Sequence, residues 1–199
     1  TILNNLESWY KNNLESYENK LADTIWCNDK STFTTYTSGS TYGTGLGYGT
    51  NQTGYGASNR VGADFIDDVA LYASPSLICP NDNNGGKLSK FTVSDTTKGN
   101  GNLTYKIGLL TADEIAFSGS AAGALNLSTY LQENAGASGW WSLSPGGFNG
   151  GGALVWGVGF GELSAYSIRH SAGLRPAISL ISSTSVTGNG TSDNPYIIN

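Results

Sequence analysis

Charged residues are scarce in this chain. Asp, Glu, Lys and Arg make up 13% of its 199 residues, about half of the ~25% that is typical of a soluble domain. The net charge is −5 and the Lys and Arg residues are scattered, so the basic surface that a nucleic acid or an anionic membrane would require is missing. No apolar run approaches the roughly 18 residues of a membrane-spanning helix, and no signal peptide is visible. We therefore expect no nucleic-acid partner and no direct membrane insertion.

Methionine is absent, histidine occurs once and cysteine occurs twice. The chain starts at Thr1 without a methionine, so we expect a processed segment whose targeting or anchoring sequence lies outside it. The single histidine, His170, has no serine elbow or neighbouring cysteine to complete a hydrolytic triad. We assign no catalytic residue and no cofactor. Cys27 and Cys79 stand in loop-like surroundings outside any C-x-x-C pair, which favours a disulfide, with two buried free thiols as the alternative.

Glycine and apolar residues are plentiful. The chain holds 28 glycines, and 38% of its residues are hydrophobic, enough for the core of one domain over residues 1–199 that is rich in loops and short strands. Residues 36–59 consist largely of Tyr, Gly, Ser, Thr and Asn. This composition is typical of recognition loops, in which tyrosine gives contact area at low entropic cost. A plain surface loop that packs its tyrosines on the domain is the alternative.

Hydrophobic periodicity predicts an α+β fold. Apolar residues at three- and four-residue steps predict an amphipathic helix over residues 2–22, which docks on a sheet or pairs with a partner helix. Residues 91–93 and 103–110 read as strands. Thr111 and Glu114 form a capping box for a short helix to Phe117, and a second short helix is expected over residues 127–133. From residue 140 onward we expect a small antiparallel meander.

Two clusters of acidic or amide residues are candidates for a catalytic or metal site. Asp64, Asp67 and Asp68 lack an opposing carboxylate for glycoside chemistry and read as turn and helix-start residues. Residues 81–86 have the composition of a calcium loop without its alternating carboxylates or closing glutamate. Calcium binding by these residues is not excluded, but their spacing does not support it, and we assign no metal site.

Residues 140–180 combine a regular frame with varied residues between its points, which suggests a binding face. Tiny, aromatic, cationic and hydroxylated side chains alternate there without one structural role. The candidate ligand-binding residues are Gly146, Gly147, Asn149, Gly152, Leu154, Trp156, Gly157, Gly159, Phe160, Ser164, Ala165, Tyr166, Ser167, Arg169, His170 and Ala172.

The frame itself resembles a known family. The motifs that carry the resemblance are Cys27-Asn28-Asp29-Lys30, residues 108–114, 141–145 and 173–180, and the C-terminal residues 188–191 with 194–198. In this order they resemble bacterial surface-associated modules with the C-type-lectin-like fold, which formylglycine-generating enzymes share with the variable proteins of diversity-generating retroelements. The resemblance covers nearly the whole chain.

This resemblance implies a non-enzymatic, receptor- or adhesin-type domain whose C-terminal segment is diversified by adenine-directed mutagenesis. Its ligand would be a protein or glycan on a cell surface, and its location extracellular or on the bacterial cell surface. The late cysteine pair of the formylglycine-generating enzymes and the calcium-dependent sugar motifs of lectins are both missing. The alternative function is a structural cell-surface or pilus-associated module without a diversified site.

Within the candidate segment we expect Trp156, Phe160 and Tyr166 to act as exposed anchors, because aromatic anchors dominate most interfaces. Arg169 and His170 would add polar contacts at the rim, whereas Arg175 belongs to the frame. Trp156 cannot arise from an Asn codon by changes at its adenines. The seven glycines between Gly146 and Gly159 reflect either mutagenesis or a structural requirement for turns and bulges.

Overall fold

The computed structural model describes most of the C-terminal half of the chain and parts of the N-terminal half. The described residues are 1–24, 26–27, 29, 32–33, 54–55, 57–61, 74–79, 103–120, 122, 129–133, 139–149, 152–159, 162–191 and 193–199, with only the backbone for 32–33, 54–55, 59, 133, 148–149 and 152. The expected strand at 91–93, the three aspartates at 64–68, residues 81–86, nearly all of the 36–59 loop and Phe160 lie outside them.

The described elements form the α+β arrangement that the sequence predicts, with short helices and small sheets. The helices are α1 (Ile2–Asn13), α2 (Ser58–Val61), α3 (Ala112–Phe117) and α4 (Tyr130–Glu133), with a 3-10 helix η1 (Glu15–Lys20). The strands are β1 (Thr32–Phe33), β2 (Gly54–Tyr55), β3 (Trp140–Asn149), β4 (Gly152–Gly159), β5 (Glu162–Ser167), β6 (Gly173–Leu174), β7 (Val186–Thr187) and β8 (Ile197–Ile198).

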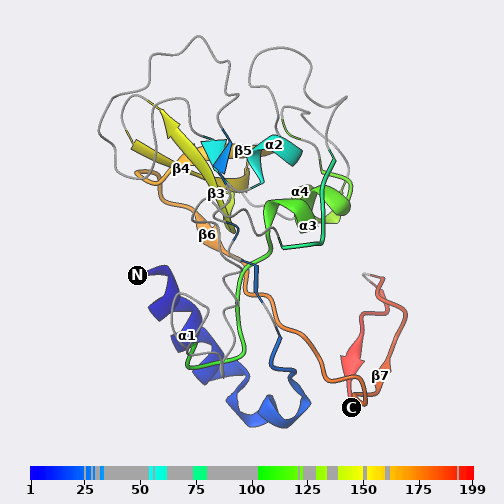
Figure 1. Cartoon of the computed structure of the whole chain (residues 1–199). Helices are drawn as coiled ribbons and strands as arrows, with labels where there is room; N and C mark the ends of the chain where they lie inside the picture. Colours follow the sequence, from blue (N-terminus) through cyan, green and yellow to red (C-terminus); the bar gives the residue numbers. More distant parts are fainter. Residues whose placement is uncertain are drawn as a thin grey trace.

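The main sheet has the order β1-β2-β3-β4-β5, with antiparallel pairing throughout. The predicted meander is therefore confirmed for β3, β4 and β5. Strand β6 departs from it, because β6 runs parallel to the start of β3 and pairs Gly173 with Trp140. In Figure 1 this sheet and helices α2 to α4 lie together, whereas α1, η1 and the β7–β8 pair lie on the opposite side of the molecule.

Trp140 and Trp141 point into two different hydrophobic clusters, as neighbouring residues of a strand do. The α2/α3 core combines Trp140, Trp156, Val158 and Leu163 of the sheet with Ala57, Val61, Ala112 and Ile115. The α1 core combines Trp141 with Leu6, Tyr10, Leu21, Ile107 and Leu109. The sheet is thus packed on both faces.

The N-terminal helix is shorter than predicted. Helix α1 ends at Asn13, and Leu14 leaves helical geometry with a φ of −126° before η1 begins. Leu21 is extended and bridges to Leu180, with an exposed fraction of 2%. A helix that continued through residue 22 could not place Leu21 in this extended pairing, so helical structure has to end before Leu21.

The predicted strand over residues 103–110 is wrong. Residues 104–106 form a bend, and Gly108 makes a single isolated bridge with Ala177. A side chain at position 108 would place its Cβ 2.5 Å from the Trp26 ring, so the indole lies directly against the backbone there. The two-residue spacing of buried Ile107 and Leu109 produced the strand-like pattern.

The predicted capping box is confirmed. The Thr111 side chain accepts a hydrogen bond from the Glu114 backbone, and the Glu114 carboxylate accepts one from the Thr111 backbone. Helix α4, residues 130–133, covers all but Thr129 of the described part of the helix predicted over 127–133. None of the described helices is long and apolar enough to cross a membrane.

Candidate functional site

Strands β3 and β4 bury most of the candidate residues that they contribute. Gly146, Gly147, Leu154, Trp156, Gly157 and Gly159 are all buried. Asn149 and Gly152 face each other where β3 meets β4, and only their backbone is described. These two strands therefore serve mainly as the scaffold of the segment.

Trp156 is not a surface anchor. Its exposed fraction is 0%, and its indole lies in the α2/α3 core. The indole N–H donates a 2.9 Å hydrogen bond to the Ser58 hydroxyl, which in turn donates a 2.7 Å bond to the Gly146 carbonyl. A buried tryptophan whose polar group is satisfied inside the protein stabilises the fold, so the expected anchor role is wrong.

Gly157 has a structural reason to be glycine. A Cβ at this position would lie 2.7 Å from the carbonyl oxygen of Trp140 on the neighbouring strand. The same Cβ at Gly159 would meet its nearest atoms, Gly139 Cα and the Tyr166 hydroxyl, at 3.4 Å, which is ordinary contact. Gly157 is therefore an architectural position, whereas Gly159 has room for a methyl group.

Tyr166 lies across β4 and packs against the α1 core. Its hydroxyl donates a 2.9 Å hydrogen bond to the Gly159 carbonyl, and its ring lies next to Gly157 and Gly159. Partial burial, and then the negative charge of Glu162, raise the pKa of Tyr166 to about 12. The phenol thus covers two glycines as a neutral group and contributes to folding as well as to the surface.

The residues of β5 and the turn that follows reach the surface. Ser164, Ala165 and Ser167 are half-buried, as is Ala172 beyond the turn, whereas Arg169 and His170 are exposed. Ile168, which the sequence analysis did not single out, has an exposed fraction of 58%. The only signal that could have found it is its place between a hydroxylated and a cationic residue in a turn.

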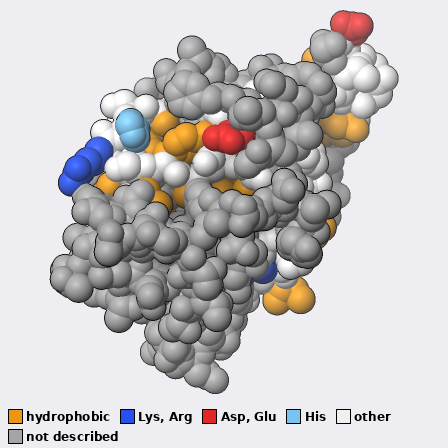
Figure 2. All heavy atoms as spheres, turned by 90° about the horizontal axis from the view of Figure 1, so that it is seen from above, with side chains coloured by type: hydrophobic (Ala, Val, Ile, Leu, Met, Phe, Trp, Pro, Cys, Tyr) orange, Lys and Arg blue, Asp and Glu red, His pale blue; other side chains and the backbone are white. Residues whose placement is uncertain are grey.

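The backbone of this turn is held in place. The Ile168 N–H donates to the Ala153 carbonyl at 3.2 Å, and the His170 N–H donates to the Ser167 carbonyl at 3.0 Å. The Ser167 hydroxyl accepts a further bond from the Arg169 N–H. Figure 2 shows this region from above: the one histidine of the chain and a cationic side chain lie beside hydrophobic side chains, with an acidic group farther along. Ser164 and Ser167 are three residues apart on β5 and therefore point to opposite faces of the sheet. The residues Ser167, Ile168, Arg169 and His170 are called the β5 face below.

The contacts of Arg175 agree with the structural role expected for it. Its guanidinium lies 5.2 Å from the centre of the Trp140 ring, within the range of a cation–π contact. Because Trp140 is a core residue with an exposed fraction of 2%, this contact ties the segment after β6 to the start of β3.

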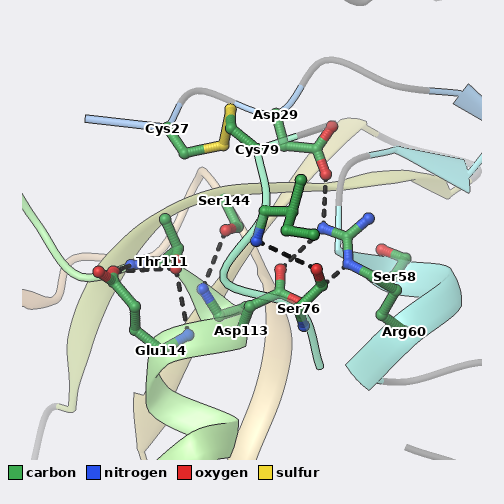
Figure 3. A network of polar contacts seen from close by, with 12 residues as sticks. Cys27, Asp29, Ser58, Arg60, Ser76, Cys79, Thr111, Asp113, Glu114 and Ser144 are labelled. Atoms are coloured by element: carbon green, nitrogen blue, oxygen red, sulfur yellow. Dashed lines mark hydrogen bonds and ion pairs between the residues drawn. A yellow bond between two sulfur atoms is a disulfide. The ribbon is translucent and has the colours of Figure 1, made fainter. Parts of the chain in front are cut away.

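A polar network that the sequence analysis missed centres on Arg60 of α2 (Figure 3). Its Nη2 contacts Asp29 at 2.6 Å and Asp113 at 2.7 Å, and its Nε donates to Asp113 at 2.8 Å. Burial acts to lower the pKa of Arg60, but hydrogen bonds to Asp113 and Asp29 outweigh it and raise that pKa. Asp113 also accepts a 2.8 Å bond from the Ser76 backbone.

The Cys27–Cys79 disulfide is present and lies beside this network, which confirms the predicted pairing. It joins the segment that carries Asp29 to the segment that carries Ser76. A cavity of about 440 Å³ opens next to the disulfide, bounded also by Trp26, Leu77, Ile78 and Ser144. A disulfide of this kind is typical of proteins of oxidising compartments.

Among the described residues, no group of three or more His, Cys, Asp and Glu side chains is placed to hold a metal ion. The carboxylates of Asp29 and Asp113 are engaged by the Arg60 guanidinium, which joins α2 to α3 and to the segment of Asp29. Comparison of the chain with protein-family models, with curated proteins and with solved structures finds no match.

Proposed function

We propose that this chain is a non-enzymatic ligand-binding domain of the receptor or adhesin type, built on a C-type-lectin-like scaffold. The observation that best supports this proposal is the division of residues 140–180 into buried and displayed parts. Strands β3 and β4 bury their side chains in two cores, and the β5 face presents varied side chains on a backbone that they support. The ligand we propose is a protein or glycan on a cell surface.

The composition of the β5 face suits recognition. Ile168 offers exposed apolar area, Arg169 and His170 offer cationic and hydrogen-bonding groups, and Ser167 offers a hydroxyl. Hydrogen bonds within the turn fix the backbone before a ligand arrives. A preorganised surface loses less conformational entropy on binding, which favours affinity.

The proposal includes diversification by adenine-directed mutagenesis. It applies to the β5 face and to Asn149 and Gly152, where β3 meets β4. Ser, Ile, Arg and His can all derive from an Asn codon through changes at its two adenines. Burial of Trp156 and the close approach at Gly157 support the alternative, purely structural interpretation for the rest of β3 and β4. The diversification interpretation therefore applies to one part of the segment, and the structural interpretation applies to the rest of β3 and β4.

A pair of display libraries tests the scaffold. One randomises Ser167, Arg169 and His170, and the matched library randomises Leu154, Trp156 and Gly157. We expect most members of the first library to keep the melting temperature of the parent, because surface changes usually alter stability by less than about 0.5 kcal/mol. Most members of the second should lose cooperative unfolding. Equal tolerance in both libraries would contradict a displayed β5 face.

Sequencing of the native gene and its flanks tests the diversification. The expected finding is a near-copy of the codons for residues 140–180 beside a reverse transcriptase gene, differing at adenines of the copy, with differences at β5-face positions. Absence of such a copy would favour the structural cell-surface module. Binding is then measured on a glycan array with the parent and with an Arg169→Ser, His170→Ser variant, which is expected to lose the signal of the parent.

A further inference from the structure

The cavity beside the disulfide shares no residue with the β5 face. Its walls come from the segments that carry Trp26 and Cys27, from residues 76–79, from the start of α3 and from Ser144 of β3. Its volume of about 440 Å³ falls within the range of roughly 300–1,000 Å³ that small-molecule clefts occupy. The disulfide and the Arg60 ion pairs connect these walls, so the cavity is formed before any ligand enters.

One side of the cavity carries exposed apolar side chains on a fixed backbone. Leu77 and Ile78 have exposed fractions of 69% and 80%. The Ser76 N–H is bound to Asp113, and the Ile78 N–H is bound to the Ser76 hydroxyl. Because this backbone is held, the two side chains stay exposed next to the disulfide, where the apolar body of a ligand would remove them from water.

The charges around the cavity are unbalanced. Among the described residues that line it, Asp29, Asp113 and Glu114 are acidic and Arg60 is the one cation. Arg60 is already engaged by the two aspartates. Glu114 uses its Oε2 to accept both hydrogen bonds from Thr111. The described part of the lining therefore carries more acidic than basic side chains, which favours a cation in a hollow that is partly shielded from water.

A buried hydroxyl adds an independent polar feature. Ser144 has an exposed fraction of 2% and lines the cavity. Its oxygen accepts a 2.9 Å hydrogen bond from the Ala112 N–H. The hydroxyl is thus partnered as an acceptor, and it can still donate its own O–H to a further group. A ligand with a hydrogen-bond acceptor would satisfy this donor.

We propose that this cavity is a second binding site, which takes a small organic cation with an apolar body and a hydrogen-bond acceptor, of the arylalkylamine class. The ammonium group lies toward the carboxylates of Glu114 and the Arg60 network. The apolar body lies against Leu77 and Ile78. The site is separate from the proposed surface ligand and does not depend on it.

The test uses three ligands that share a 4-hydroxyphenylethyl body and carry a cationic, a neutral or an anionic end group. Tyramine, its alcohol counterpart tyrosol and its carboxylate counterpart 3-(4-hydroxyphenyl)propionate are titrated into the disulfide-bonded protein. Binding is followed by calorimetry and by the amide resonances of Ser76, Leu77 and Ile78. We expect tyramine to bind at least about tenfold more tightly than tyrosol, and the carboxylate to bind weakest. Equal affinities, or no saturable shift of these amides with tyramine, would overturn the proposal.

Two variants locate the ligand. Glu114→Gln keeps the capping box, since Gln serves at this position as well, but removes one negative charge. It should weaken tyramine binding several-fold at an unchanged melting temperature. Leu77→Ser with Ile78→Ser should also weaken it, whereas Ile197→Ser, at a 59% exposed position of β8, should not. Unchanged tyramine affinity in both site variants would refute the assignment.

A third variant separates this site from the proposed surface function. Arg169→Ser with His170→Ser should leave tyramine affinity unchanged while abolishing the glycan-array signal. Loss of tyramine binding in that variant would mean that the amine binds the β5 face, and the cavity proposal would then be wrong.

Discussion

The indole N–H of Trp156 and the hydroxyl of Ser58 form a buried 2.9 Å hydrogen bond that joins strand β4 to helix α2. The two residues are 98 positions apart in the chain. The Ser58 hydroxyl in turn donates a hydrogen bond to the Gly146 carbonyl of β3. One short chain of donors thus connects the helix with both central strands, and it fixes the sheet beneath the β5 face.

Replacing Trp156 by Ala should therefore reduce the free energy of unfolding by about 3–5 kcal/mol, the range for large core aromatics. Ser58→Ala should cost about 1–3 kcal/mol, because the indole N–H loses its acceptor in the core. Urea unfolding measures both. Arg169→Ala on the exposed turn is the control and should stay within about 0.5 kcal/mol of the parent. A stable Trp156→Ala protein would return Trp156 to the surface role.

Gly157 and Gly159 form a matched pair on one strand. Gly157→Ala places a methyl group 2.7 Å from the Trp140 carbonyl oxygen, whereas in Gly159→Ala the nearest atoms are at 3.4 Å. We expect the first change to cost about 1–3 kcal/mol through strand displacement and the second to cost less than about 1 kcal/mol. Thermal unfolding compares the two. If both variants lose equal stability, the close approach at Gly157 is not the cause.

Local sequence signals predicted the local structure best. The capping box of Thr111 and Glu114 is a pattern within four residues, and it was confirmed. Periodicity predicts helix α1 but not its end at Asn13, and Leu21, which the predicted helix includes, instead pairs with Leu180 across the fold. Periodicity indicates which residues are buried. It does not indicate which of them leave the helix to pair with a distant part of the chain.

The candidate site was harder to predict for the same reason. Trp156 reads as a varied residue in sequence, and its place in the core depends on distant partners such as Ser58, 98 positions away. Arg60 gave no local signal, since its partners Asp29 and Asp113 lie 31 and 53 positions away. Glycine content could not separate an obligatory Gly157 from a permissive Gly159, because the distinction rests on one carbonyl of the neighbouring strand.

The disulfide should contribute strongly to stability. Cys27 and Cys79 are separated by 52 positions, and closing such a loop contributes about 4 kcal/mol on the chain-entropy model. Reduction with dithiothreitol should therefore lower the urea midpoint markedly. A Cys27→Ala, Cys79→Ala variant should match the reduced protein and no longer respond to the reductant. A reduced protein as stable as the oxidised one would show that the Arg60 network alone holds these segments.

Tyr166 should make stability fall at alkaline pH. Its pKa is about 12 in the folded chain and about 10 when unfolded, so between these values the unfolded state binds fewer protons than the folded state. The contribution of Tyr166 is thus fully present below about pH 10 and decreases as the pH rises toward 12. Tyr166→Phe removes the titrating group together with its hydrogen bond to Gly159, at a cost of about 1 kcal/mol near neutral pH.

The stability difference between the parent and Tyr166→Phe should therefore shrink between pH 9 and pH 11. Urea unfolding at the two pH values measures that difference. Because the other tyrosines titrate in both proteins, comparing the two chains cancels their common effect. Tyr196→Phe, at a position that is 64% exposed, serves as the control for the removal of an exposed phenol. A parent-to-variant difference that is the same at both pH values would mean that Tyr166 ionises as it does in the unfolded chain, and its phenol would not be the neutral cover over Gly157 and Gly159.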